Sequence, residues 1–366
     1  MPPISLFEKL TLVLRGLGII PHMLYAAIHT RSPRKIRIAV NRYITGALSI
    51  SQIQYVMSPT LSTYRAFTSS PLSSSSSSAN ITEIPGDAPC RLLWLGQYQP
   101  GKKVLLYFHG GGYVMPITKE HLMYCEYVRS TVGPEDLAVA VLEYTNTPGR
   151  RYPYQLAQAS AALSHLLASG VAPADLVLGG DSAGGHLVLS VISHVLHTHP
   201  SVRAVSPALA APLAGICLLS PATTFRVTAD SFRRNDGRDI IKQSTCEYWS
   251  AQLTGGDSGY WDEAEGGGWW GEVVSAPEDW WRGVAGVVKR CLVTAGEREV
   301  ILDDILRLGE TFEKLGEDWT VERVLGKGEI HDSALMDYIL EKKACGETTI
   351  RSAKWVGEAL GIAARV

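Results

Sequence analysis

The sequence predicts an α/β fold, in which parallel strands alternate with helices around one sheet. Two observations carry this prediction. Short apolar runs bounded by turn residues recur along the chain, as is typical of central parallel strands. Helical stretches separate several of these runs, as right-handed crossovers between parallel strands require. The length of 366 residues allows one large α/β domain with an attached lid, or two domains.

From residue 81 onward the expected elements follow one another in a regular order. Strands are expected at 91–97, 102–112, 136–145, 174–182, 213–221, 289–297 and in the first part of 319–330. Helices are expected at 154–170, 183–199 and 299–315. The stretch 183–199 is apolar on nearly all sides, which predicts a buried helix. We therefore assign residues 81–221 and 289–366 to the α/β core.

Two segments depart from this alternation. Residues 1–80 indicate a helical segment that ends in a serine-rich loop at 69–80, whose composition cannot pack a core. Residues 222–288 form an insertion that holds six of the nine tryptophans: Trp249, Trp261, Trp269, Trp270, Trp280 and Trp281. Such rings either pack the insertion onto the core or line an apolar pocket. The sequence leaves both interpretations open.

Residues 10–28 are apolar but are interrupted by Arg15, Pro21 and His22. A membrane-spanning helix needs about 20 largely apolar residues without such breaks. We therefore expect an amphipathic helix that covers the body or lies on its surface, with peripheral membrane contact as the alternative. A signal peptide is not expected, because the sequence shows no basic region followed by a small-residue cleavage site.

Composition excludes several classes of partner. The net charge of −2 gives no basic footprint for nucleic acid. The six cysteines form no CxxC pair, which favours reduced thiols inside a cell over a disulfide framework. We expect a cytoplasmic protein, with association with the endoplasmic-reticulum membrane as the alternative. His194, His197 and His199 are close in sequence but lack acidic partners, so no metal site is expected.

One hydroxyl is surrounded by glycines in the stretch Gly180-Asp181-Ser182-Ala183-Gly184. A strand that runs into G-x-S-x-G and then a helix is the nucleophile elbow of α/β-hydrolases. The glycines permit a tight strand-to-helix turn, and the turn lifts the serine hydroxyl above the sheet edge. The positive end of the following helix then faces the place where negative charge develops. Ser182 is the predicted nucleophile.

A second glycine cluster, "YFHGGGY" at 107–113, ends an expected strand upstream of the serine. Consecutive glycines expose backbone N–H groups without side-chain obstruction. We expect the N–H groups of Gly111, Gly112 and Ala183 to form an oxyanion hole, in which each donor is worth about 10²–10³ in rate. A merely flexible glycine loop is the alternative.

A serine hydroxyl needs a base to accept its proton, and histidine is the usual one. His109 belongs to the glycine loop, where we expect it to support the backbone rather than accept a proton. The histidines at 186, 194, 197 and 199 lie on or beside the helix after Ser182, which points away from the reactive face. His331 differs because it lies in a loop after a strand.

The motifs "HGGGY", "LEYTNTPGRRYPYQLAQA" (142–159) and "GDSAGGHL" together resemble the hormone-sensitive-lipase-like branch of the α/β-hydrolase fold family. That branch includes arylacetamide-deacetylase-like, steryl-deacetylase-like and fungal proteins, and the resemblance covers residues 88–345. It implies an α/β-hydrolase fold with a mostly parallel sheet. It also implies that 1–80 and 222–288 form a helical cap over the site.

The resemblance also implies the roles of individual residues. The family order of serine, acid and histidine makes His331, in "GEIHDS", the base. The acid belongs in the loop after 289–297, which offers Glu297, Glu299, Asp303 and Asp304. Many relatives have Asp-Pro-Leu there; this chain departs from that pattern and aligns with relatives that carry glutamate. Glu299 is the expected acid and Asp303 the alternative. Supporting positions in the two motifs are His109, Gly110, Gly180, Asp181 and Gly184.

These residues predict a serine carboxylic ester hydrolase that works through an acyl-enzyme and needs no metal or organic cofactor. The resemblance implies a short acyl group, such as acetyl, on an apolar alcohol or secondary metabolite. The same residues could transfer an acyl group or cleave a thioester in biosynthesis. A non-catalytic binding protein is a further alternative, since plant relatives include hormone receptors, but those have usually lost one of the three residue types present here. The sequence does not indicate an oligomeric state.

Overall fold

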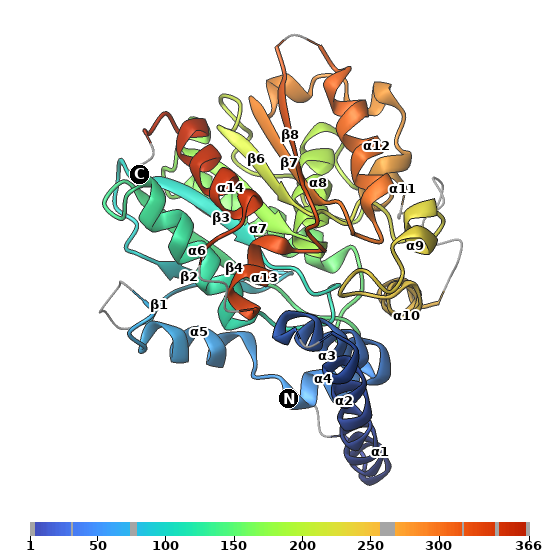
Figure 1. Ribbon diagram of the computed structural model, residues 1–366. Helices are drawn as coiled ribbons and strands as arrows, with labels where there is room; N and C mark the ends of the chain where they lie inside the picture. The colour runs from blue at the N-terminus through green and yellow to red at the C-terminus, as the bar shows by residue number, and fades with distance from the viewer. Residues whose placement is uncertain are drawn as a thin grey trace.

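The computed structural model describes residues 4–30, 32–73, 79–256, 268–316, 318–340 and 344–363. Residues 74–78 of the serine-rich loop and Trp261 lie outside the described residues. Within the described part, one eight-stranded sheet runs through the molecule between two layers of helices (Figure 1). The predicted α/β class is therefore confirmed.

The strand order in the sheet is β1-β2-β4-β3-β5-β6-β7-β8. β2 is antiparallel to both β1 and β4, and the remaining neighbours are parallel. The strands are β1 (Asn80–Ile84), β2 (Cys90–Leu95), β3 (Lys103–Phe108), β4 (Leu137–Glu143), β5 (Leu176–Asp181), β6 (Gly215–Leu219), β7 (Arg290–Gly296) and β8 (Thr320–Gly326).

Alternate side chains of the strands feed two apolar cores, one on each face of the sheet. The central strands β4, β5 and β6 are buried along almost their whole length, because helices cover both of their faces. One face is covered by α7 (Tyr154–Ala168), α8 (Ala183–Leu196) and α12 (Leu302–Glu313). The other face is covered by α5 (Thr60–Thr68), α6 (Lys119–Val132) and α14 (Glu347–Ala359).

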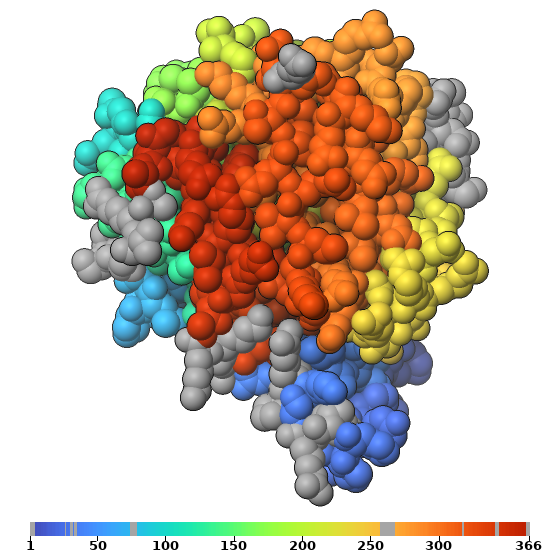
Figure 2. Space-filling view, turned by 45° about the horizontal axis from the view of Figure 1, so that its top comes forward, coloured from blue at the N-terminus to red at the C-terminus, as the bar shows by residue number. Residues whose placement is uncertain are grey.

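The remaining helices gather around one end of the sheet and its edges. The N-terminal ones project from the lower end of the molecule in Figures 1 and 2. They are α1 (Leu6–Leu17), α2 (Ile19–Thr30), α3 (Pro33–Ala47) and α4 (Ile50–Val56). Those of the insertion and C-terminal part are α9 (Asp230–Arg234), α10 (Gln243–Thr254), α11 (Gly268–Gly271) and α13 (Ser333–Ile339). Short 3₁₀ turns lie at Pro173–Asp175, Val273–Ser275, Glu278–Trp281 and Val284–Gly286.

All seven strands expected from the sequence are present, and β1 and α6 are among the elements that were not expected. β1 is an edge strand with only one buried residue, so its sequence lacks the apolar run of the inner strands. α6 is amphipathic only in part, because it buries Glu126 and Arg129 as an ion pair 2.7 Å apart. Polar residues on a buried face conceal the apolar period on which a helix prediction depends.

Candidate active site

Ser182 occupies the turn between β5 and α8 with a positive φ of 48°. The glycines on either side are required by close backbone approach. A Cβ on Gly184 would lie 1.9 Å from the carbonyl oxygen of Phe108, and one on Gly180 would lie 2.5 Å from the backbone of Gly184. The Ser182 N–H donates to the carbonyl of Leu219 at 2.9 Å. The strained turn is thus fixed by its neighbours, which is the geometry of a nucleophile elbow.

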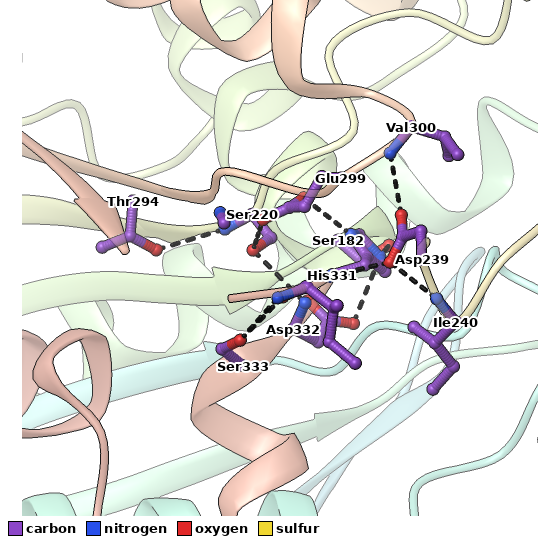
Figure 3. A network of polar contacts seen from close by, with 12 residues as sticks. Ser182, Ser220, Asp239, Ile240, Thr294, Glu299, Val300, His331, Asp332 and Ser333 are labelled. Atoms are coloured by element: carbon purple, nitrogen blue, oxygen red, sulfur yellow. Dashed lines mark hydrogen bonds and ion pairs between the residues drawn. The ribbon is translucent and has the colours of Figure 1, made fainter. Parts of the chain in front are cut away.

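Three loops at the same end of the sheet bring Ser182, His331 and Glu299 together (Figure 3). The Nε2 of His331 lies 2.9 Å from the hydroxyl oxygen of Ser182, and its Nδ1 lies 3.0 Å from Oε2 of Glu299. His331 and Glu299 are buried. In the neutral tautomer that fits these partners, Nδ1 donates to the carboxylate and Nε2 accepts from the serine. The arrangement can move a proton from an alcohol to an imidazole.

The carboxylate of Glu299 is held by donors other than the imidazole. The Ser220 hydroxyl donates to its Oε1 at 2.6 Å, and the N–H of Gly296 donates to the same oxygen. The Ser220 oxygen accepts the N–H of Asp332 at 3.3 Å. Ser220 therefore fixes the carboxylate and also ties it to the loop that carries the imidazole.

Asp303, the alternative acid, faces elsewhere. It lies on the first turn of α12, forms an ion pair with Arg234, and accepts the N–H of Ser231 at 2.8 Å. Both partners belong to α9. Asp303 holds the insertion against α12, and the structure does not bring it to the imidazole.

A buried carboxylate that the sequence reasoning missed lies behind His331. Asp239, in the insertion, accepts the backbone N–H groups of His331 at 2.9 Å, Val300 at 2.8 Å and Ile240 at 2.7 Å. Burial raises the pKa of Asp239 to about 6, although His331 opposes this shift. Asp239 therefore joins the loop of Glu299 to the loop of His331. No motif marks this residue, because its partners are main-chain groups of distant segments.

Carboxylates set the protonation of His331. Burial on its own lowers the pKa of this imidazole. Asp332, whose Oδ2 lies 3.3 Å from Nε2, and Glu299 on Nδ1 outweigh burial and raise the pKa of His331 above its ordinary value. Burial in turn raises the pKa of the Asp332 carboxyl well above its ordinary value. Asp239 adds to the same shift. The imidazolium form is stabilised in this site, which helps any reaction in which His331 gains a proton.

Asp181 connects the nucleophile turn to the glycine loop. Its side chain is fully buried and accepts the Tyr107 hydroxyl at 2.5 Å and the Gly110 N–H at 3.0 Å. The Nε2 of His121 lies 3.3 Å from Asp181. Burial raises the pKa of Asp181, but His121 and the Tyr107 hydroxyl outweigh burial, so its pKa is lowered. Asp181 thus anchors the loop as a carboxylate.

Gly111, Gly112 and Ala183 lie beside Ser182 on the wall of a cavity. Among the described residues, the backbone N–H groups of these three have no acceptor. His109 points elsewhere. Its Nδ1 lies 2.8 Å from the carbonyl of Gly110, and its ring stacks on Tyr144 with centroids 4.3 Å apart. Burial lowers the pKa of His109 to about 3, so the ring is neutral.

The cavity above Ser182 has a volume of about 430 Å³. Its reactive end is formed by Ser182 and His331, and the remaining wall is largely apolar. Side chains from three parts of the chain form that wall: Ile44 of α3, Phe225 and Ile241 of the insertion, Trp249 of α10, and Leu335 and Met336 of α13. A ligand bound here would lie between the N-terminal helices, the insertion and the sheet edge.

The tryptophans of the insertion divide between the two expected roles. Trp249 lines the cavity. Trp270 and Trp280 pack against α8, where their Nε1 groups donate to the carbonyl of His197 at 2.6 Å and the hydroxyl of Ser193 at 2.8 Å. Trp281 is fully buried against Phe312. Of these four tryptophans, one therefore serves the cavity and three fasten the insertion to the core.

The chain is similar to known proteins in sequence and in fold. Residues 105–335 match the family model described as the alpha/beta hydrolase fold. The chain is 28% identical over 167 residues to an acetyl-hydrolase of Streptomyces hygroscopicus, covering 44% of this chain and 51% of that protein. It is 33% identical over 137 residues to the versiconal hemiacetal acetate esterase of Aspergillus parasiticus, covering 36% and 39%. The chain thus spans about half the length of these relatives or less.

Among solved structures, an esterase from the bacterial hormone-sensitive lipase family superposes with a TM-score of 0.64. The superposition covers 90% of this chain and 97% of that one, at 23% sequence identity. At this identity the likeness concerns the fold. It covers more of the chain than the family model, which matches residues 105–335.

Proposed function

The chain belongs to the alpha/beta hydrolase fold family, in its hormone-sensitive-lipase-like branch, and from this premise we propose that it hydrolyses carboxylic esters through an acyl-enzyme. One observation carries the proposal: Ser182, His331 and Glu299 form a continuous chain of contacts of 2.9 and 3.0 Å at the end of an apolar cavity. A serine, a histidine and an oriented carboxylate in this order are the groups that acyl transfer requires.

In the first half of the reaction, the Ser182 oxygen bonds to the ester carbonyl carbon while its proton passes to Nε2 of His331. The carbonyl oxygen becomes an oxyanion, which the N–H groups of Gly111, Gly112 and Ala183 hold. Their lack of protein acceptors in the described chain supports this role. Glu299 keeps Nδ1 protonated, so that Nε2 is free to accept, and stabilises the imidazolium that forms.

In the second half, His331 returns its proton to the alcohol oxygen as the bond between the acyl carbon and that oxygen breaks. The alcohol leaves and the acyl group remains on Ser182. A water molecule then attacks the acyl carbon while His331 accepts its proton. The second intermediate collapses as the bond between the acyl carbon and the Ser182 oxygen breaks and His331 returns the proton to that oxygen, which releases the acid and restores the serine. The proton and the charge both return to their starting places.

The cavity supports a substrate with a short acyl group and an apolar alcohol. A volume of about 430 Å³ that is shared by both parts of an ester favours a small acyl group, such as acetyl, when the alcohol is large. The names of two relatives refer to acetate or acetyl hydrolysis. We propose that residues 1–80 and 222–288 form the cap over this cavity, since α3 and α10 both supply its wall.

Labelling with a fluorophosphonate, which reacts with activated serines, tests the proposal. We expect labelling of the wild type and none of Ser182→Ala. A series of nitrophenyl esters from acetyl to decanoyl then measures chain-length preference, with the highest kcat/KM at the short end. Ester turnover that survives in Ser182→Ala would contradict the proposal. If a new ester forms when a competing alcohol is added, the proposed reaction would be acyl transfer instead of hydrolysis.

A further inference from the structure

Helices α1 and α2 carry a continuous stripe of exposed apolar side chains. Leu6, Leu10, Val13, Leu17, Ile20 and Leu24 are each at least 54% exposed, and they recur every three or four residues. This spacing places them on one face of a helix over two successive elements. No residue of α1 is buried. Contiguous exposed apolar surface on a folded protein marks a site of interaction.

The opposite, polar face of α1 contacts the body of the protein. The side-chain amide of Gln52 on α4 donates to the carbonyl of Glu8 at 2.8 Å and to the Thr11 hydroxyl at 2.9 Å. The Arg15 guanidinium donates to the Gln52 side-chain oxygen at 2.6 Å. A helix that covers a soluble protein turns its apolar face inward. Here the orientation is reversed, so the apolar face is left for another partner.

Charge is distributed unevenly between this region and the rest of the chain. Residues 1–80 contain a single acidic residue, Glu8, and eight basic ones: Lys9, Arg15, Arg31, Arg34, Lys35, Arg37, Arg42 and Arg65. Their net charge is therefore +7, and since the whole chain carries −2, residues 81–366 carry −9. An apolar face within a basic segment is complementary to a membrane surface with anionic headgroups.

We propose that α1 and α2 dock this protein on an anionic lipid bilayer, with their exposed apolar face inserted at the boundary between headgroups and acyl chains. The segment Leu6–His29 is long and apolar enough to span a membrane by length and composition. The contacts of its polar face favour docking over spanning. Arg15 lies near the middle of the segment and is hydrogen-bonded to α4, which a spanning helix would have to give up.

Docking in this orientation brings the cavity close to the membrane. α3, which follows α2 directly, supplies Asn41, Ile44 and Thr45 to the cavity wall. An apolar ester dissolved in the bilayer could thus reach Ser182 by a short path. This consequence rests on the proposed function, whereas the docking itself does not.

Vesicle flotation tests docking without any need for activity. Full-length Ser182→Ala protein is mixed with phosphatidylcholine vesicles with or without phosphatidylserine. We expect it to float with the anionic vesicles and to be released by high salt, which screens the headgroup charge. The triple variant Leu10→Glu/Leu17→Glu/Leu24→Glu should lower the partition coefficient by about 100-fold or more, because three apolar anchors are lost.

A matched triple variant controls for added charge. Leu72→Glu/Leu325→Glu/Ile350→Glu replaces apolar residues that are 53%, 50% and 37% exposed outside α1 and α2, and should float as the parent does. Equal flotation of the parent and the α1–α2 variant would overturn the proposal. The proposal would also be overturned if the parent formed a dimer without vesicles and the α1–α2 variant were a monomer. Vesicle binding that resists alkaline extraction would likewise overturn it, because such binding indicates a spanning helix.

The path to Ser182 has a separate measurement in the active protein. The α1–α2 variant should hydrolyse water-soluble nitrophenyl acetate at the parental rate, but an apolar ester held in anionic vesicles at least about 10-fold more slowly. Equal rates on the vesicle-held ester would refute delivery from the bilayer. If the wild type cleaves neither ester, the proposed function fails, and the flotation result stands independently.

Discussion

The two halves of the active site are held together in different ways. The half that includes the nucleophile turn and the glycine loop consists of two short sequence motifs, and a motif residue joins them, because the Asp181 side chain accepts the Gly110 N–H. The half that includes Glu299 and His331 is fixed by the side chains of Ser220 and Asp239, which come from other segments of the chain. Both sets of contacts join distant segments, but local sequence motifs mark the residues of the first half, whereas no motif marks Ser220 and Asp239 in the second. Substitutions in each half should therefore fail in different ways.

The largest effect is expected at the nucleophile itself. Ser182→Ala removes the attacking oxygen and leaves the turn and the glycine loop in place. We expect kcat on nitrophenyl acetate to fall by about 10⁶-fold with no loss of thermal stability. Steady-state kinetics and a melting curve measure the two quantities. A reduction below about 10²-fold would mean that another group performs the attack.

Glu299→Gln should have the next largest effect. The amide cannot stabilise an imidazolium and can present an N–H to Nδ1, which favours the wrong tautomer. We expect a loss of about 10⁴-fold in kcat with little change in KM. Asp303→Asn is the matched control, since it removes a carboxylate four residues away that does not contact the imidazole, and it should retain near-parental turnover. A large loss of kcat in Asp303→Asn together with parental kcat in Glu299→Gln would show that Asp303 is the acid.

Asp239→Asn tests whether tertiary contacts align the second half. An amide nitrogen in place of Oδ2 faces the backbone donor of Val300, and one in place of Oδ1 faces those of His331 and Ile240. At least one buried hydrogen bond is therefore lost, at a cost of about 1–3 kcal/mol. We expect a lower melting temperature and a kcat reduced by about 10-fold, with KM nearly unchanged. Asp236→Asn, at a half-exposed neighbouring carboxylate, serves as the control. Parental kcat in Asp239→Asn would show that alignment does not depend on this residue.

The pH profile gives the smallest but most specific effect. Because carboxylates raise the pKa of His331, its imidazole stays protonated to higher pH than a free histidine and accepts a proton only above that pKa. Turnover should therefore fall as pH decreases, with the acidic limb above the ordinary value of about 6.5. Asp332→Asn removes one of these carboxylates and should shift the limb to lower pH. A wild-type limb at or below about 6.5 would contradict the shift.

The contrast between the two halves also explains how far sequence reasoning reached. The inner strands and the two glycine motifs are local patterns, so their positions could be predicted. β1 and α6 were missed because the edge strand is mostly exposed and the helix buries charged residues. Asp239 and Ser220 could not be found, because each acts on groups that are distant in sequence. The family resemblance, rather than spacing, led to Glu299.

Asp239 has a consequence for redesign of this protein. It belongs to the insertion, whose Phe225, Ile241 and Trp249 shape the cavity, yet its hydrogen bonds hold the loops that carry the imidazole and its carboxylate. A donor insertion transplanted to change which alcohol is accepted would arrive without this anchor. The insertion therefore affects both substrate selectivity and turnover. A chimera with a new selectivity must keep a hydrogen-bond acceptor at position 239 to retain turnover.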